Sequence, residues 1–225
     1  MSMARLSRCR GWLFLACVSG VFSLCAFGQT PAPNAKELAN RVDHHYNSLR
    51  SLKSVFTQTY QGLGMDRTES GTLLLLKPGR MRWNYNAPKG KVFILNGKYA
   101  WSYTPGDAQA QRIPAKELND LRSPLRYLLG HAQLNRELEH LTAIPAADGE
   151  VTLTGVPKGM ENRVAQLTLT VTADGTITAI SIKEIDGSVT SFAFTDQVPN
   201  AAISPATFQF TPPPGVPVVD ALPPV

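Results

Sequence analysis

Cysteine is scarce in this chain of 225 residues. Only three are present, Cys9, Cys17 and Cys25, and all lie within the first 28 residues. A disulfide or a thiolate metal site requires cysteines in the folded protein. If the first 28 residues are removed on export, the mature chain can contain neither kind of site.

Long apolar runs are also scarce, and the one that stands out is residues 11–24. At about 14 residues it is too short to cross a bilayer as a helix, but it is typical of the core of a secretory signal. Small residues at Ala26 and Gly28 then fit the positions that a signal peptidase reads. We predict a cleaved signal, residues 1–28. Three arginines and no acid precede the apolar run: Arg5, Arg8 and Arg10.

A lipoprotein signal is the alternative interpretation of the same segment, with Cys25 or Cys17 as the acylated residue. Leu24 is bulky for the position before Cys25, and Cys17 comes early in the apolar run. We therefore favour cleavage after Gly28, which sequencing of the exported N-terminus would test.

An excess of charge of one sign is nearly absent after this cleavage. The whole chain has 22 Lys and Arg against 17 Asp and Glu, and the signal contains three of the arginines. A mature chain of about 197 residues keeps a net charge of about +2. Nucleic-acid-binding modules are strongly basic, so no nucleic-acid partner is expected. The length suffices for a single domain, residues 29–225, with a substantial core.

Signatures of catalysis are missing as well. The sequence has no Gly-x-Ser-x-Gly elbow, no His-Glu-x-x-His and no phosphate-binding loop. His44 and His45 are adjacent on a predicted helix, where their side chains point about 100° apart and cannot share a metal. We expect no enzyme, cofactor or metal, although sequence alone leaves open a Ser-His-Asp set assembled from distant residues, which could include His131 or His140.

The remaining sequence is dominated by strand patterns. An amphipathic helix is predicted over residues 34–50, with Asn34 as its N-cap and Glu37 as capping-box partner. A strand over 52–60 follows, and then a meander over 71–105 that is divided by Pro-Gly, Ala-Pro-Lys-Gly and Asn-Gly turns. The apolar stripe of the helix consists of Leu38, Val42, Tyr46 and Leu49.

The second half of the chain begins with a short predicted strand over 108–113 and an interruption of the β pattern over 114–141. Ser123 and Pro124 predict the start of a short helix there. Residues 134–144 fit either a helix or an edge strand, and a proline-rich tail ends the chain on the surface. Four further strands are predicted at 151–156, 164–172, 176–184 and 188–198.

These elements predict a mainly β fold with some α structure. About ten strands form a strongly curved antiparallel sheet around a hollow, with the helices as plug or lid. Apolar side chains recur on one face of successive strands, as Met81, Trp83 and Tyr85 do. Such a face suits either an ordinary packed core or a hydrophobic ligand cavity, and composition does not distinguish them.

Seven short runs in this sequence resemble, in order and spacing, the LolA family of periplasmic carriers of outer-membrane lipoproteins. They are Val55–Gln58, Ser70–Leu73, Lys77–Tyr85, Asn96–Lys98, Trp101–Tyr103, Ser123–Leu125 and Phe208–Pro213. The resemblance covers nearly the whole mature chain. It implies an unclosed β-barrel with a helical lid, located in the periplasm of a diderm bacterium and acting as a monomer.

The resemblance also implies the ligand and the partners. The cavity would accept the acyl chains of lipoproteins, which an inner-membrane ABC transporter releases and the outer-membrane receptor LolB accepts. A basic residue that holds the lid by hydrogen bonds to lid backbone falls on Lys77, where many relatives have arginine. Lysine lacks the planar fork of arginine, so a weaker latch is expected. The aromatic residue found near the cavity mouth in many relatives is Met81 here, which gives a softer lining.

The residue roles that follow are hypotheses based on strand parity and on the resemblance. A slip of one residue would exchange Leu73 and Leu75 for Leu74 and Leu76. Two functions remain as alternatives to lipoprotein transport. The protein could carry free lipid or glycolipid, or it could be a lipoprotein-sensing envelope regulator. The lid would contain Leu121, Leu125, Leu128 and Leu129. The cavity would be lined by Phe56, Leu73, Leu75, Met81, Trp83, Tyr85, Phe93 and Trp101.

Overall fold

The computed structural model describes residues 33–115, 127–128 and 133–220, which belong to one compact unit, Ala32–Val225. The predicted signal, residues 1–28, lies outside the described residues. Helix α1 (Ala35–Ser48) begins after Asn34, whose side-chain oxygen accepts hydrogen bonds from the backbone N–H groups of Lys36 (3.1 Å) and Glu37 (3.2 Å). This confirms the predicted N-cap. The four residues of the predicted apolar stripe are all buried.

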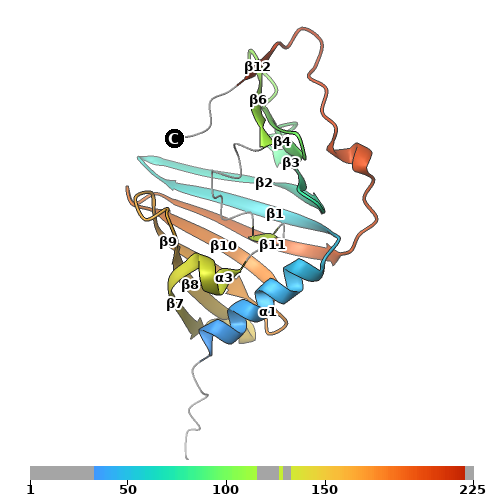
Figure 1. Ribbon diagram of the computed structural model, residues 1–225. Coiled ribbons are helices and arrows are strands. Elements are labelled where there is room, and N and C mark those ends of the chain that lie inside the picture. The colour runs from blue at the N-terminus through green and yellow to red at the C-terminus, as the bar shows by residue number, and fades with distance from the viewer. Residues whose placement is uncertain (1–32, 116–126, 129–132, 221–225) are drawn as a thin grey trace, which may run out of the picture. The chain divides into compact units, whose positions relative to one another are not determined.

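Twelve strands within the described residues form a single sheet in the order β12-β6-β5-β4-β3-β2-β1-β11-β10-β9-β8-β7. The β12–β6 pair is parallel and the other neighbours are antiparallel. The sheet curves, and α1 and α3 (Leu134–Glu137) lie against one of its faces (Figure 1). Since β12 and β7 occupy opposite ends of the order, the sheet is unclosed, as the resemblance implied. The strand bounds are β1 (Ser51–Gly62), β2 (Met65–Leu76), β3 (Arg80–Ala87), β4 (Val92–Asn96), β5 (Tyr99–Tyr103), β6 (Ala110–Pro114), β7 (Leu138–Pro145), β8 (Val151–Pro157), β9 (Val164–Val171), β10 (Ile177–Glu184), β11 (Val189–Pro199) and β12 (Val218–Asp220).

Strand β2 differs most from its prediction. It was expected to begin at Thr72, but it pairs with β1 from Met65 onward along twelve residues. Its first half, residues 65–70, is mostly polar and exposed, so its sequence has no apolar alternation to reveal it. Backbone pairing with β1 extends the hairpin instead.

The ambiguous segment over 134–144 contains both of the predicted structures in succession. A single helical turn, α3, is followed directly by the edge strand β7. The predicted helix after Ser123 lies outside the described residues except for Tyr127 and Leu128, which are buried in a 3-10 turn.

The C-terminal tail, residues 205–220, packs on the sheet at its start, whereas its proline-rich part, residues 212–217, is mostly exposed, as predicted. A 3-10 helix, η3 (Pro205–Phe208), places Phe208 in a fully buried position. Arg82 donates from Nη1 to the carbonyl oxygens of Thr207 (2.8 Å) and Gln209 (3.2 Å). The tail ends in β12, where Asp220 accepts a hydrogen bond from Arg112 Nε (2.8 Å). It therefore packs on β3 and covers the edge strand β6, which would otherwise expose unpaired backbone groups.

Within the described residues, no helix is long and apolar enough to span a bilayer.

Candidate functional site

The face of the sheet that α1 covers, called the inner face below, contains seven of the eight predicted lining residues. Residues directly opposite each other on neighbouring strands point to the same side of a sheet. Leu73 pairs with Trp83 and Trp83 with Phe93, while Leu75 pairs with Met81. The predicted parity is therefore confirmed, and Leu74 and Leu76 point to the other side. The seven residues are Phe56, Leu73, Leu75, Met81, Trp83, Tyr85 and Phe93.

A glycine makes room for the aromatic part of this face. Gly71 lies opposite Phe56 on β1 and opposite Tyr85 on β3. A Cβ atom at position 71 would lie 2.9 Å from Phe56 Cε1 and 1.9 Å from the Asn84 carbonyl oxygen. Without that atom, the Phe56 ring packs edge-on against Trp83 with centroids 4.5 Å apart. The Ser-Gly-Thr-Leu run of the sequence thus has a packing reason.

The eighth predicted residue, Trp101, was assigned to the wrong face. It pairs with Ile94, which pairs with Arg82, so these three residues point to the outer face. Its ring packs against Phe210 of the tail with centroids 5.5 Å apart. Alternation within β5 gave the correct period, but the turn at Asn96-Gly97 sets which side each residue takes, and that register is a property of the pairing.

The inner face is covered in this structure by the protein's own side chains. Leu38, Val42 and Tyr46 of α1 belong to the same buried cluster as Leu73, Met81 and Trp83, and so do Tyr127 and Leu128. Leu128 is the one predicted lid residue whose position is described, and it belongs to this buried cluster. Leu121, Leu125 and Leu129 lie outside the described residues. In this structure the protein's own residues therefore bury this apolar face.

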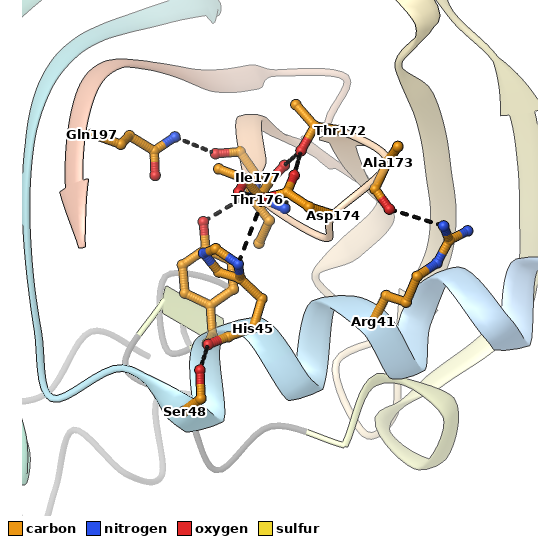
Figure 2. Close-up of polar contacts among 10 residues, drawn as sticks. Arg41, His45, Ser48, Thr172, Ala173, Asp174, Thr176, Ile177 and Gln197 are labelled. Atoms are coloured by element: carbon orange, nitrogen blue, oxygen red, sulfur yellow. Dashed lines mark hydrogen bonds and ion pairs between the residues drawn. The ribbon is translucent and has the colours of Figure 1, made fainter. Parts of the chain in front are cut away.

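Polar contacts with the β9–β10 turn hold helix α1 against the inner face (Figure 2). Arg41 Nη1 donates to the Ala173 carbonyl oxygen (2.8 Å), and Tyr46 Oη accepts from the Ile177 N–H (3.0 Å). Gly175 of this turn has φ +92° and lies so close to α1 that a Cβ atom would be 2.6 Å from the Arg41 carbonyl oxygen. These contacts hold one side of α1 against the sheet.

Lys77, the predicted latch, follows β2, and its side chain reaches the C-terminal end of α1. Its Nζ donates to the carbonyl oxygens of Tyr46 (2.5 Å) and Asn47 (3.1 Å). A cation there satisfies carbonyls that have no partner within the helix and interacts favourably with the helix dipole. Burial lowers the pKa of Lys77. The resemblance placed this bond on the lid backbone, whereas the described bonds of Lys77 are to α1.

Asp43 connects the opposite side of α1 to the segment that leads into β7. Its carboxylate oxygens accept hydrogen bonds from the Leu134 N–H at 3.0 and 3.2 Å, at the start of α3. Burial raises the pKa of Asp43 to about 6, and the nearby charge of Glu137 also raises it, while the bond from Leu134 opposes both effects. No local pattern indicates this contact, because it joins residues 91 positions apart.

The raised pKa of Asp43 predicts a pH-dependent contribution to stability. Because the folded-state pKa is about 6 and the ordinary value is 3.8, the folded protein binds a proton between these pH values that the unfolded chain does not. Protonation therefore stabilises the fold in this window, and the contribution is lost as the pH rises through about 6. Relative to Asp43→Asn, the wild type should gain on the order of 1 kcal/mol from pH 7 to pH 4, since solvent screens a half-buried carboxylate.

Urea unfolding of both proteins at several pH values measures this difference. Asparagine at position 43 still accepts a bond from Leu134 and does not titrate, so it isolates the charge. Parallel stability curves for the two proteins between pH 7 and pH 4 would contradict the assignment.

The inner face becomes polar beyond Trp83, toward the β1–β2 hairpin. Tyr85 Oη donates to Gln58 Oε1 (3.1 Å), and Lys91 Nζ bonds both carboxylate oxygens of Glu69 at 2.8 and 2.7 Å. Lys91 also lies 4.4 Å from the centroid of the Tyr85 ring. Burial raises the pKa of Tyr85 to about 12, with the charge of Glu69 adding to the shift. Sequence reasoning missed Gln58, Glu69 and Lys91, although alternation along β1 places Gln58 on the same face as Phe56.

Known proteins match both the sequence and the fold. The family model described as outer membrane lipoprotein carrier protein LolA matches residues 47–211. An outer-membrane lipoprotein carrier protein of Chromobacterium violaceum is 30% identical over 188 residues, which cover 84% of this chain and 90% of that protein. One from Edwardsiella ictaluri is 30% identical over 218 residues, covering 92% and 97%.

The fold also resembles that of a solved structure. An uncharacterized conserved protein from Thermus thermophilus superposes with a TM-score of 0.53 at 15% identity, covering 83% of this chain and 99% of that one. That similarity concerns the fold alone. The family match and the two relatives, together with the unclosed sheet and its covered apolar face, show that this chain belongs to the LolA family of outer membrane lipoprotein carrier proteins.

Proposed function

We propose that this protein carries lipoproteins from the inner to the outer membrane, with their acyl chains held against the inner face of the sheet. The observation that supports this most directly is the inner face itself. Seven large apolar or aromatic side chains from four adjacent strands point to one side, and two short segments cover them. An uncovered face of this kind could not persist in water, so another apolar surface must replace the cover whenever it moves.

The thermodynamics of acyl chains explains why such a carrier is needed. Each buried CH₂ contributes about 0.8 kcal/mol, so a lipoprotein with two or three chains does not leave a membrane for water on a useful timescale. A soluble protein that offers an equivalent apolar surface removes this barrier. It must also release the chains, which is possible when its own side chains compete for the same surface.

Tyr127 and Leu128 are the proposed competitors. They are buried against the inner face in the closed state, and acyl chains would take their place in the loaded state. Loading exchanges one apolar contact for another, so the net gain stays far below the full transfer energy of the chains. A carrier with this property can both accept and deliver its cargo.

The remaining parts of the proposal follow from the family. Residues 1–28 direct export to the periplasm, where the monomeric mature protein receives lipoproteins from an inner-membrane ABC transporter. It passes them to LolB or an equivalent outer-membrane receptor. No catalytic step is required, because the cargo is moved and not altered.

The test is release of lipoprotein from spheroplasts by the purified mature protein. The triacylated lipoprotein should appear in the soluble fraction in complex with the protein, whereas the same lipoprotein with its acylated cysteine replaced by serine should not bind. Equal binding of the unacylated form would overturn the proposal. Recovery of free lipid or glycolipid alone would instead support a lipid carrier of the same fold.

A further inference from the structure

Trp83 carries a buried hydrogen-bond donor on the inner face. The residue is 2% exposed, and its indole N–H has no partner among the residues that the structure describes. Buried polar groups are nearly always hydrogen-bonded, so an exception calls for an explanation. The surroundings are the rings of Phe56, Phe192 and Phe194, at centroid distances of 4.5, 5.4 and 6.4 Å. Aromatic rings are weak acceptors at best.

The position of this donor on the inner face is distinctive. Along β3, the same side of the strand presents first Met81, then Trp83, then Tyr85, over about 13 Å. Met81 is surrounded by apolar side chains, whereas Tyr85 bonds Gln58 and contacts Lys91. Trp83 therefore lies where the face changes from apolar to polar.

An acylated lipoprotein has the same order of chemical groups. Its hydrocarbon chains are followed by ester carbonyls and then by the peptide. Resting on the carrier function proposed above, we infer that Trp83 Nε1 donates a hydrogen bond to the carbonyl oxygen of an ester-linked acyl chain of the cargo. The hydrocarbon then lies toward Met81 and Leu75, and the peptide leaves past Tyr85 and Gln58 toward the β1–β2 hairpin.

This assignment explains how an apolar site selects a class of lipid. A purely apolar surface binds any hydrocarbon of suitable size with similar affinity. A buried donor that is satisfied only by the ligand favours an ester over an ether of the same shape, because the carbonyl oxygen is the stronger acceptor. Trp83 is thus a specificity-determining residue for acyl esters.

The experiment compares two synthetic lipopeptides with a free amino terminus and identical chains, one with ester linkages and one with ether linkages. The wild-type mature protein should bind the ester about three- to tenfold more tightly. Trp83→Phe keeps an aromatic ring without the N–H and should bind both equally. Trp101→Phe is the matched control, since Trp101 also has an unpaired indole N–H among the described residues but lies on the outer face. It should keep the wild-type ratio.

A second measurement does not depend on the folding of a variant. The mature chain contains two tryptophans, Trp83 and Trp101, so its nitrogen-15 spectrum has two indole signals. The ester lipopeptide should move the Trp83 proton to higher frequency than the ether lipopeptide does. Equal shifts with both, or an ester preference that survives Trp83→Phe, would overturn the assignment. Failure of the wild type to bind either lipopeptide would overturn the carrier function itself.

Discussion

Replacing Met81 by glutamate is expected to reduce uptake of acylated lipoprotein by at least about tenfold. Met81 is buried on β3 between Leu75 and Leu95, on the inner face. A carboxylate there must either stay hydrated, which keeps water on the apolar surface, or take up a proton at a cost in stability. Loss of contact with two methylenes already amounts to about 1.6 kcal/mol, which is more than a factor of ten in affinity.

Two variants separate this effect from general damage. Met81→Leu conserves volume and apolarity and should retain uptake. Leu74→Glu makes a similar charge change on the neighbouring strand, but Leu74 is half-buried and faces the other side, so uptake should also persist. The measurements are lipoprotein release from spheroplasts and thermal unfolding. Normal uptake by a folded Met81→Glu protein would remove Met81 from the site.

Replacing Lys77 by methionine is expected to slow delivery of cargo to the outer membrane by up to about tenfold. The side chain of Lys77 holds the last turn of α1 through two carbonyl oxygens, and α1 covers the inner face. Bonds that favour the closed, empty state help to expel the cargo. Loss of the two hydrogen bonds of Lys77, at about 1.4 kcal/mol, would make cargo binding about tenfold tighter and would slow release of the cargo accordingly.

Lys77→Arg is the matched control, because guanidinium can donate to both carbonyls and should preserve delivery. The assay follows transfer from the preloaded carrier to outer-membrane vesicles, with binding of cargo measured separately. The latch hypothesis requires that methionine raises retention while the fold stays intact. Equal transfer rates for wild type, methionine and arginine would show that Lys77 only stabilises α1.

Several features could be predicted from sequence because they depend on neighbours along the chain. The N-cap at Asn34 and the buried stripe of α1 follow from helical periodicity. Alternation within each strand puts Leu73 and Leu75 on one side of β2, and Met81 and Trp83 on one side of β3. A strand or helix fixes these directions locally, so no knowledge of distant contacts is needed.

Other features depend on pairing between distant segments. Trp101 points away from the inner face because of the register between β4 and β5. Phe208, which precedes the exposed proline-rich part of the tail, is buried through the 3-10 helix η3. The Glu69–Lys91 pair and the bond from Leu134 to Asp43 likewise join residues far apart in sequence. No local pattern encodes such distances.

The sequence by itself determined that this chain forms a mainly β domain with an apolar side on successive strands, because side-chain direction alternates within each strand. Only the tertiary structure decided which strands share that side, what covers it, and where it becomes polar. Those outcomes depend on strand register and on the docking of α1 and the tail, which are settled by contacts between segments distant in sequence. The indole N–H of Trp83, which has no acceptor among the described residues, belongs to this second group, since hydrogen-bond partners are set by neighbours in space.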